Sequence, residues 1–405
     1  MCEEPERLSA QQANECHGDE GEDLTSPIED WDDMDLSPDL LRGVFAIGFE
    51  KPSPIQARAI RPVVQGRDVV GQAQSGTGKT GCFAIAALQR VDPSLQKTQV
   101  LILSPTRELS QQTKKVVERL SVKMTGLRSQ LLVGGTSTDA DASALMSNPP
   151  HVVVGCPGRV HDMLRRRRLR VDALKVFILD EADEMLSQGF KEQVYDIFQF
   201  LGQSVQIALF SATMPPAVHS LTDKFMRDPV QILVKADMLT LEGIQQHYVA
   251  LDDDEQKYGT LKDLYSVLTL SQCIVYCNSV RRVQDLYDAM QADEFPVCQM
   301  HSGMEREERQ QSYADFSSGK TRVLISSNVT ARGIDVQQVS TVINFDVPRD
   351  VETYLHRIGR SGRWGRKGMG INFVTRRDTH RMREIERHYA TTITELPADI
   401  GQRHV

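Results

Sequence analysis

The sequence predicts an α/β protein with two tandem domains, each a parallel sheet with helices on both faces. Short runs rich in Val and Ile alternate with longer segments of helical periodicity, which is typical of parallel strands joined by helices. This pattern occurs twice along the chain. The length of 405 residues also fits two domains better than one. We expect the first domain at 34–236, a linker at 237–243 and the second domain at 244–405.

The expected strands end in small or polar residues, where loops toward a ligand would begin. In the first domain they are 68–73, 100–106, 152–158, 176–183 and 206–213, and in the second 246–251, 273–279, 297–302, 322–327, 341–347 and 370–375. Ligands of such sheets bind beyond the carboxyl ends of the strands. A binding site is therefore expected along one edge of each sheet.

Charge is distributed unevenly along the chain. Residues 1–33 hold twelve Asp and Glu and a single Arg, whereas the whole chain has a formal net charge of −8. The remainder is therefore mildly basic. A segment so acidic and poor in aromatic residues is expected to be a disordered tail, because it cannot bury enough apolar surface to offset the entropy of ordering.

The composition excludes several classes of protein. No apolar run approaches the roughly 20 residues that a membrane span requires. The N-terminus has no basic stretch followed by an apolar one, so no secretory signal is expected. The seven cysteines lack paired CxxC spacing, which argues against a disulfide framework and a zinc site and predicts reduced thiols.

The strongest local signal is AQSGTGKT, which lies between an expected strand and an expected helix. Gly76 and Gly78 allow backbone amides to face an anion, and the following helix presents its positive end to the same group. Lys79 would reach the outer phosphates of a nucleotide, and Thr80 would supply a hydroxyl to Mg²⁺. The expected phosphate-binding loop consists of Ala73, Gln74, Ser75, Gly76, Thr77, Gly78, Lys79 and Thr80.

Two acids end the apolar run VFILDEAD. Asp180 is expected to hold Mg²⁺, largely through water, and Glu181 to orient and activate the attacking water. Acids at the start of an exposed helix also interact favourably with its dipole, and that alternative requires no metal. The phosphate-binding loop upstream favours the catalytic interpretation.

The second domain contains the basic segment HRIGRSGRWGRKG at 356–368. Arg360 and Arg363 are three residues apart, on one side of a helical turn, and could reach one phosphate from across a cleft as arginine fingers. The alternative is a basic surface segment that is solvated or contacts RNA phosphates. A second basic run, RRRRLR at 165–170, is interpreted as a solvated helix end.

Nine motifs occur in one order along the chain: GFEKPSPIQ, AQSGTGKT, PTREL, GG, CPGR, DEAD, SAT, ARGID and HRIGRSGR. From about Trp31 to the C-terminus the sequence therefore resembles the DEAD-box RNA helicases. Within that family it is similar to translation initiation factor 4A and its relative in the exon junction complex, for which LLRGVFAIGFEKPSPIQ, DEADEMLSQGF, TLEGI and GRKG are typical. The resemblance implies two tandem RecA-like domains that bind ATP and Mg²⁺ at their seam.

The resemblance also implies roles for residues that the pattern alone does not reveal. Phe49 would stack on the adenine and Gln56 would hydrogen-bond its edge. Asp335 would contact the ribose, and His356 would relay contacts toward the DEAD segment. The implied RNA-binding residues are Pro105, Thr106, Arg107, Gly135, Pro157, Gly158, Arg159, Arg309 and Ser327.

Coupling of the nucleotide state to RNA binding is assigned by the resemblance to the SAT motif, which comprises Ser211, Ala212 and Thr213. In isolation these residues would be interpreted as an ordinary strand end or helix cap.

Some positions depart from the family pattern. Cys156 replaces a Thr, Ser327 and Asn328 replace Thr and Asp, Gly303 replaces an acid, and Arg306 replaces a Gln.

The expected function is that of an ATP-dependent RNA helicase that clamps single-stranded RNA through its backbone and separates short duplexes. Two alternatives stay open. One is an ATP-gated RNA clamp that hydrolyses slowly and serves as an assembly platform, and the other is a motor that translocates on DNA. Expected partners are RNA and proteins of the translation initiation or exon junction machinery. The free chain is expected to be a monomer in the nucleus or cytoplasm, with a lean to the nucleus.

Overall fold

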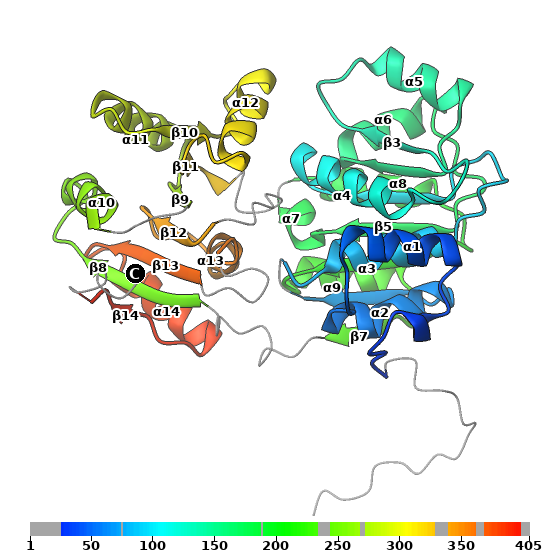
Figure 1. The fold of residues 1–405 in the computed structure, drawn as a ribbon, viewed down its shortest axis with the longest axis horizontal. Coiled ribbons are helices and arrows are strands. Elements are labelled where there is room, and N and C mark those ends of the chain that lie inside the picture. Colours follow the sequence, from blue (N-terminus) through cyan, green and yellow to red (C-terminus); the bar gives the residue numbers. More distant parts are fainter. Residues whose placement is uncertain are drawn as a thin grey trace, which may run out of the picture.

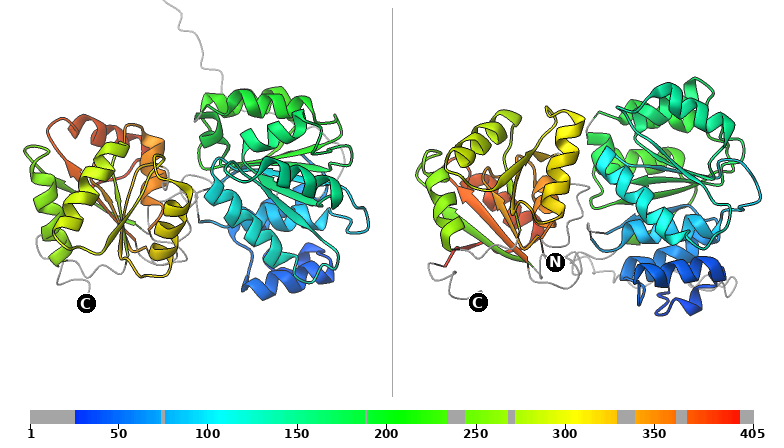
Figure 2. Two further views of the ribbon diagram at one scale, coloured as in Figure 1. Left: turned by 90° about the horizontal axis from the view of Figure 1, so that it is seen from above. Right: turned by 45° about the horizontal axis from the view of Figure 1, so that its top comes forward.

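The computed structural model describes residues 26–73, 76–187, 189–233, 244–267, 272–328, 339–361 and 368–397. They form two units, each built on a sheet of seven parallel strands. The first unit comprises residues up to 233 and the second unit residues 244–397. Figure 1 shows them side by side, the first unit in blue to green and the second in yellow-green to red, and Figure 2 shows the same separation from two further directions.

The first sheet has the strand order β3-β4-β2-β5-β6-β1-β7. The bounds of its strands are β1 Val69–Gln72, β2 Val100–Leu103, β3 Ser129–Leu132, β4 Val152–Gly155, β5 Val176–Asp180, β6 Gln206–Ser211 and β7 Val230–Leu233. Successive residues of a strand face opposite sides. Accordingly, Ile102 packs in one apolar layer and its neighbour Leu101 in the other.

The second sheet has the order β10-β11-β9-β12-β13-β8-β14. Its strands are β8 Ile244–Ala250, β9 Cys273–Tyr276, β10 Val297–Met300, β11 Val323–Ser326, β12 Thr341–Asn344, β13 Gly368–Val374 and β14 Thr394–Glu395. Numbered from its own first strand, this order is the same as in the first sheet. The two units therefore share one topology, and the predicted pair of parallel α/β domains is confirmed.

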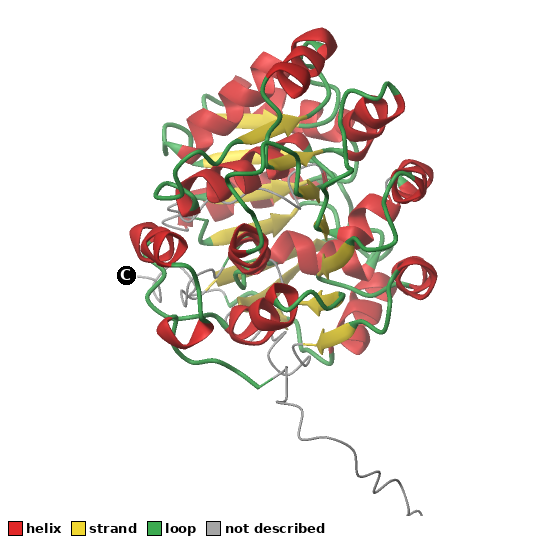
Figure 3. Cartoon of the chain, turned by 90° about the vertical axis from the view of Figure 1, so that its right-hand side faces the viewer, coloured by secondary structure: helices red, strands yellow, loops and turns green. Residues whose placement is uncertain are grey.

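Helices cover both faces of each sheet (Figures 1 and 2), and Figure 3 shows this for the first unit, which lies in front. In the first unit they are α1 Pro38–Ile47, α2 Pro54–Val64, α3 Lys79–Gln89, α4 Arg107–Leu120, α5 Thr138–Ser147, α6 Pro157–Arg165, α7 Ala182–Ser187, α8 Lys191–Gln199 and α9 Pro216–Phe225. In the second unit they are α10 Gln256–Val267, α11 Val280–Ala292, α12 Arg306–Ser317, α13 Val351–Ile358 and α14 Thr379–Tyr389.

The first unit begins before the expected boundary at residue 34. Ile28 donates its backbone N–H to Ala57 O at 3.0 Å, and the Trp31 side chain is fully buried. Trp31 also stacks on Phe49, with ring centroids 6.3 Å apart. These apolar contacts order residues that the acidic composition had assigned to the tail. The expected linker at 237–243 lies outside the described residues.

The two units face one another along a seam formed by α4 and α7 of the first unit and α12 and α13 of the second (Figure 1). Gln112 of α4 donates to the Tyr313 hydroxyl of α12 at 3.1 Å. Beside it, Arg309 of α12 lies 3.4 Å from Glu108 of α4. These contacts bring α12 to the first unit.

Two further expectations concern features of the described chain. No helix in the described ranges is long and apolar enough to cross a membrane. The described cysteines, which are Cys82, Cys156, Cys273, Cys277 and Cys298, are all free thiols, as predicted.

Candidate active site

The expected phosphate-binding loop joins β1 to α3, as its sequence position predicts. Gly76 and Gly78 adopt φ values of 87° and 97°, a left-handed conformation that glycine reaches without strain. A side chain at Gly78 would also place its Cβ 2.8 Å from Gln56 Nε2. Both features explain the need for glycine here. Gln74 and Ser75 lie outside the described residues.

Gln56 connects the start of α2 to this loop. Its side-chain oxygen accepts from the backbone N–H of Ser53 at 2.8 Å, and its amide donates to Gly78 O at 3.2 Å. Phe49 lies close by, since a Cβ at Gly81 in α3 would lie 3.0 Å from its ring. The two residues predicted to contact adenine are thus gathered beside the phosphate-binding loop.

Lys79, the first residue of α3, has a buried ammonium group held by two contacts. Its Nζ donates to Ala73 O at 2.8 Å and lies 3.5 Å from Glu181 Oε1. Both side chains of this ion pair are at least nine-tenths buried. The cation therefore stands between the loop and the acidic pair at the end of β5.

Asp180 ends β5, and Glu181 follows it with a φ of 52°, an uncommon conformation for a residue with a side chain. Burial raises the pKa of Asp180 to about 7, and repulsion from Glu181 adds to the shift while Lys79 opposes it. Asp180 Oδ1 is buried and has no hydrogen-bond partner among the described residues. A buried carboxylate oxygen of this kind fits a Mg²⁺ site, directly or through water.

The shifted pKa of Asp180 has a consequence for stability. The folded protein retains a proton that an unfolded Asp, with a pKa of about 4, releases, so this contribution is lost as the pH rises from about 4 to about 7. We expect Asp180→Asn, which cannot ionise, to raise the melting temperature of protein free of nucleotide and metal by about 2–4 °C or more at pH 8.

The gain should be smaller at pH 5, where less of the stability has been lost. Melting curves in EDTA at both pH values test this prediction. Asp263→Asn, at an exposed position of α10, is the matched control. An equal change at both pH values would contradict the predicted ionisation.

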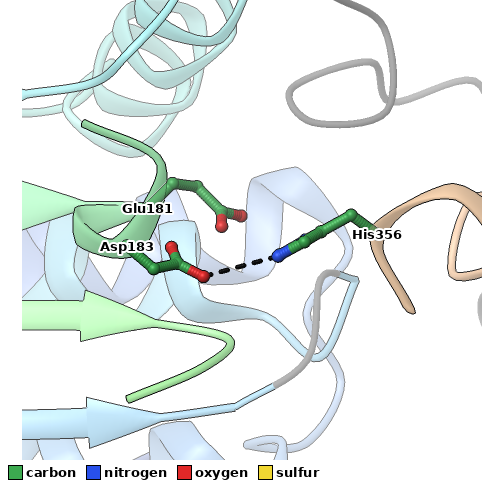
Figure 4. Close-up of side chains that lie close together, drawn as sticks. All are labelled: Glu181, Asp183 and His356. Atoms are coloured by element: carbon green, nitrogen blue, oxygen red, sulfur yellow. Dashed lines mark ion pairs between the residues drawn. The ribbon is translucent and has the colours of Figure 1, made fainter. Parts of the chain in front are cut away.

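Asp183 links three segments at the seam. Its Oδ2 accepts from the Thr213 hydroxyl at 2.6 Å and lies 3.4 Å from His356 Nε2 of α13 (Figure 4). Its backbone N–H donates to Ser211 Oγ at 3.4 Å. The carbonyl of Ala212, the middle residue of the SAT motif, accepts from Gln72 at 3.3 Å. The SAT motif is thus connected to both β1 and the DEAD segment.

The second unit contributes α13 to this site. Its His356 contacts Asp183 beside Glu181, and all three side chains are buried (Figure 4). Arg360 is also buried, and its Nε donates to His356 O at 3.1 Å. The remaining expected contributors from this unit, Arg363 and Asp335, lie outside the described residues.

The expected RNA-binding residues of the first unit follow β2, β3 and β4, which are neighbours in the sheet. Pro105 and Thr106 follow β2, and Thr106 caps α4 by accepting from Leu109 N at 3.2 Å. Arg107 lies against Gly135, where a Cβ would be 2.7 Å from its guanidinium. Gly135 has a φ of 82°. The structure therefore brings the PTREL and GG loops together.

The CPGR segment begins α6 on the same edge. Gly158, next to Pro157, has open space where a Cβ would lie. Arg159 is engaged within the protein, because its guanidinium pairs with Asp141 and donates to Thr136 O at 2.9 Å. Cys156 Sγ lies 3.5 Å from Ser110 Oγ.

In the second unit, Ser327 directly follows β11, and its N–H bonds Met300 O at 3.3 Å. Arg309, predicted to bind RNA, instead contacts Glu108 across the seam. Gly303 donates its N–H to His301 Nδ1 at 3.1 Å, and Asn328 accepts from Arg357. The side chain of Arg306 lies outside the described part.

Sequence reasoning missed Asp183, Glu108 and Arg357. Asp183 was visible within DEAD but reads locally as a helix start. Glu108 belongs to PTREL, and only the placement of α12 reveals its partner.

The basic run at 165–170 precedes β5 and so lies at the opposite edge of the sheet from the loops after β2, β3 and β4. This location is consistent with the interpretation of the run as a solvated helix end.

Comparison with known proteins agrees with this site. A family model described as DEAD/DEAH box helicase matches residues 53–221, and one described as helicase conserved C-terminal domain matches residues 256–365. The chain is 55% identical over 374 residues to the ATP-dependent RNA helicase eIF4A of Neurospora crassa, covering 92% of this chain and 94% of that protein. It is 55% identical over 373 residues to eIF4A of Aspergillus clavatus, covering 92% and 93%.

Solved structures also resemble the chain. Saccharomyces cerevisiae Dbp5 bound to RNA and ADP BeF3 has a TM-score of 0.85 at 34% identity, covering 93% of this chain and 98% of that one. Dbp5 bound to Nup159, Gle1, IP6 and ADP has a TM-score of 0.64 at 34% identity, covering 91% and 97%. A DEAD box protein from Methanococcus jannaschii has a TM-score of 0.55 at 33% identity, covering 92% and 100%.

Proposed function

This chain belongs to the DEAD-box helicases, as an ATP-dependent RNA helicase of the eIF4A type, and from that premise we propose that it uses ATP to clamp and locally unwind RNA during translation initiation. The observation that carries the proposal is the contact of His356 with Asp183, which joins the second unit to the acids beside the phosphate-binding loop. An ATP site assembled from both units makes RNA binding depend on the nucleotide.

The nucleotide would be held mainly by the first unit. Phe49 would stack on adenine and Gln56 would recognise its edge, while the residues of the phosphate-binding loop and Lys79 would hold the phosphates. Asp335 would reach the ribose. Arg360 and Arg363 would neutralise the charge that develops on the phosphate oxygens during transfer.

Mg²⁺ is proposed at Thr80 and Asp180, where it would neutralise phosphate charge when bound. Glu181 would take a proton from the attacking water. Lys79 Nζ, 3.5 Å from Glu181 Oε1, places a positive charge beside this buried carboxylate.

RNA would cross the edge formed by the loops after β2, β3 and β4 and continue onto Ser327. Backbone amides, Arg107 and the open approach at Gly158 suit phosphate and sugar contacts, which are independent of base sequence. For Arg159 and Arg309 to join them, each would exchange its carboxylate partner for an RNA phosphate.

The comparison with solved structures supports RNA clamping that depends on ATP. Among three neighbours of nearly equal identity, the TM-score is higher against the one bound to RNA and ADP BeF3 than against the others. This likeness to a form bound to RNA and a nucleotide analogue supports a proposal in which the units close together on ATP and RNA. The SAT motif would couple the nucleotide state to RNA binding, because its Ser211 and Thr213 both contact Asp183 of the DEAD segment.

The name of the relatives favours translation initiation over exon junction processing, and with it the cytoplasm over the nucleus. Protein partners of the initiation machinery, a monomeric free state and a division of the chain at the linker 237–243 belong to the same proposal. The slow RNA clamp is kept as a second candidate, because Asn328 and Gly303 depart from the family pattern.

ATPase turnover of the purified chain, measured without nucleic acid, with single-stranded RNA and with single-stranded DNA, tests the proposal. Stimulation by RNA alone, with strand separation of a short RNA duplex, is the expected result. ATP-dependent RNA retention without appreciable turnover would identify the clamp. Equal stimulation by DNA, or no response to RNA, would contradict the proposed function.

A further inference from the structure

Arg357 is a fully buried cation whose hydrogen-bond partners are all neutral oxygens. It lies on α13 directly after His356. A guanidinium has five N–H donors, and each has an acceptor here. Nε donates to Asn328 Oδ1 at 3.0 Å, Nη1 to Asn344 Oδ1 at 3.1 Å and Asp346 O at 2.9 Å, and Nη2 to Asn278 Oδ1 at 2.8 Å and Asn328 Oδ1 at 2.6 Å.

No carboxylate of the described residues forms an ion pair with Arg357. Asp346 gives it only a backbone carbonyl, because the Asp346 carboxylate binds Lys257 at 3.2 Å and Arg282 at 2.8 Å. The Tyr276 ring, 5.1 Å from the guanidinium carbon, adds a cation–π contact. The buried charge is therefore satisfied by hydrogen bonds without a direct ion pair among the described residues.

Asn328 differs from Asn278 and Asn344, the other two asparagines that accept from Arg357. It is exposed, whereas Asn344 is buried and Asn278 is half-buried. It also accepts twice, from Nε and Nη2. It follows β11 by two residues and is adjacent to Ser327, whose role in RNA binding we propose above. Asn328 thus joins the loop after β11 to α13.

We propose that Asn328 is a positioning residue that determines how firmly Arg357 fixes α13, and thereby where His356 and Arg360 stand at the ATP site. This inference rests on the proposed function. The path from Arg357 to the ATP site is short. His356 directly precedes Arg357 in α13, and the His356 carbonyl accepts from Arg360 Nε at 3.1 Å. A neutral amide holds the cation less strongly than a carboxylate would, because a carboxylate adds Coulomb attraction between opposite charges to the same hydrogen bonds.

The test is a pair of substitutions that change the same contact in opposite directions. Asn328→Asp supplies a carboxylate to Arg357, and Asn328→Ala removes both accepted bonds. With a non-hydrolysable ATP analogue, we expect the RNA concentration for half-maximal binding to fall about three- to tenfold in Asn328→Asp and to rise by a similar factor in Asn328→Ala.

The analogue's affinity without RNA should stay within about twofold of the parent, because the first unit supplies most of that site. Asn148→Asp and Asn148→Ala, at an exposed position after α5, are the matched controls. Unchanged RNA half-saturation in both Asn328 variants, or a change in melting temperature alone, overturns the inference.

If the parent chain binds no RNA with the analogue, the proposed function fails and hydrogen exchange decides the inference separately. Slower exchange of the amides at 351–361 in Asn328→Asp and faster exchange in Asn328→Ala support it. Unchanged exchange in both overturns it.

Discussion

Glu181→Gln is expected to lower RNA-stimulated ATP turnover by about 10²- to 10⁴-fold, the usual contribution of a positioned general base. Gln has the shape of Glu and can still accept from the buried Lys79, 3.5 Å away, but it cannot take a proton from water. ATP binding should persist, and RNA should be retained longer in the presence of ATP because the release step is lost. Steady-state turnover and the dissociation rate of labelled RNA measure the two effects.

Glu192→Gln provides the control for this variant, since Glu192 lies on the first turn of α8 and is exposed. It should leave turnover and RNA release unchanged. Turnover of Glu181→Gln within about tenfold of the parent would mean that another group activates the water.

Lys79→Ala should produce a different defect, although it breaks the same ion pair. Removing the cation takes away a phosphate ligand, and truncating one partner of a buried charge pair at a binding site costs of the order of 2–5 kcal/mol, or about 30- to 4,000-fold in affinity. We therefore expect ATP binding itself to be lost, and with it ATP-dependent RNA retention. Titration calorimetry with ATP and Mg²⁺ measures this directly.

Lys97→Ala is the matched control, because Lys97 is half-exposed and pairs with Asp172 on the surface at 2.6 Å. It should bind ATP normally. If Lys79→Ala also bound ATP with unchanged affinity, the proposed role of the lysine would be wrong. The contrast between retained and lost binding at one ion pair separates catalysis from nucleotide recognition.

The fold could be predicted from the sequence where strands are central and apolar. β2, β4, β5, β9 and β11 are continuous buried runs. The strands β3, β7 and β14 were not expected, and all three lie at or next to a sheet edge. β3 has the sequence SQLL and is mostly half-buried, and β14 has two residues. Such short edge strands leave little hydrophobic pattern to detect.

The local parts of the site were predictable because each motif supplies a known backbone conformation and side chain. The phosphate-binding loop and the acids after β5 are of this kind. Contacts between distant segments were not predictable. Glu108 with Arg309, and Arg357 with three asparagines, depend on how the elements pack and leave no local signature. Trp31 was misassigned because the acids around it dominate the composition of that segment.

The seam between the units has a consequence for how little energy is needed to move them. None of the four hydrophobic clusters among the described residues includes residues of both units. The described contacts across the seam include single polar pairs such as Glu108 with Arg309. Residues 234–243 join the two units in the sequence.

A seam without a shared hydrophobic cluster among the described residues gives little apolar stabilisation to the apposed form, so a modest free energy can shift the units between apposed and separated forms. Moving such a balance from 1:99 to 99:1 requires about 5.5 kcal/mol of differential affinity. Under the function proposed above, a nucleotide and an RNA strand would each contact both units and together supply this free energy. The resting arrangement of the units would then depend on the concentrations of ATP and RNA around the protein.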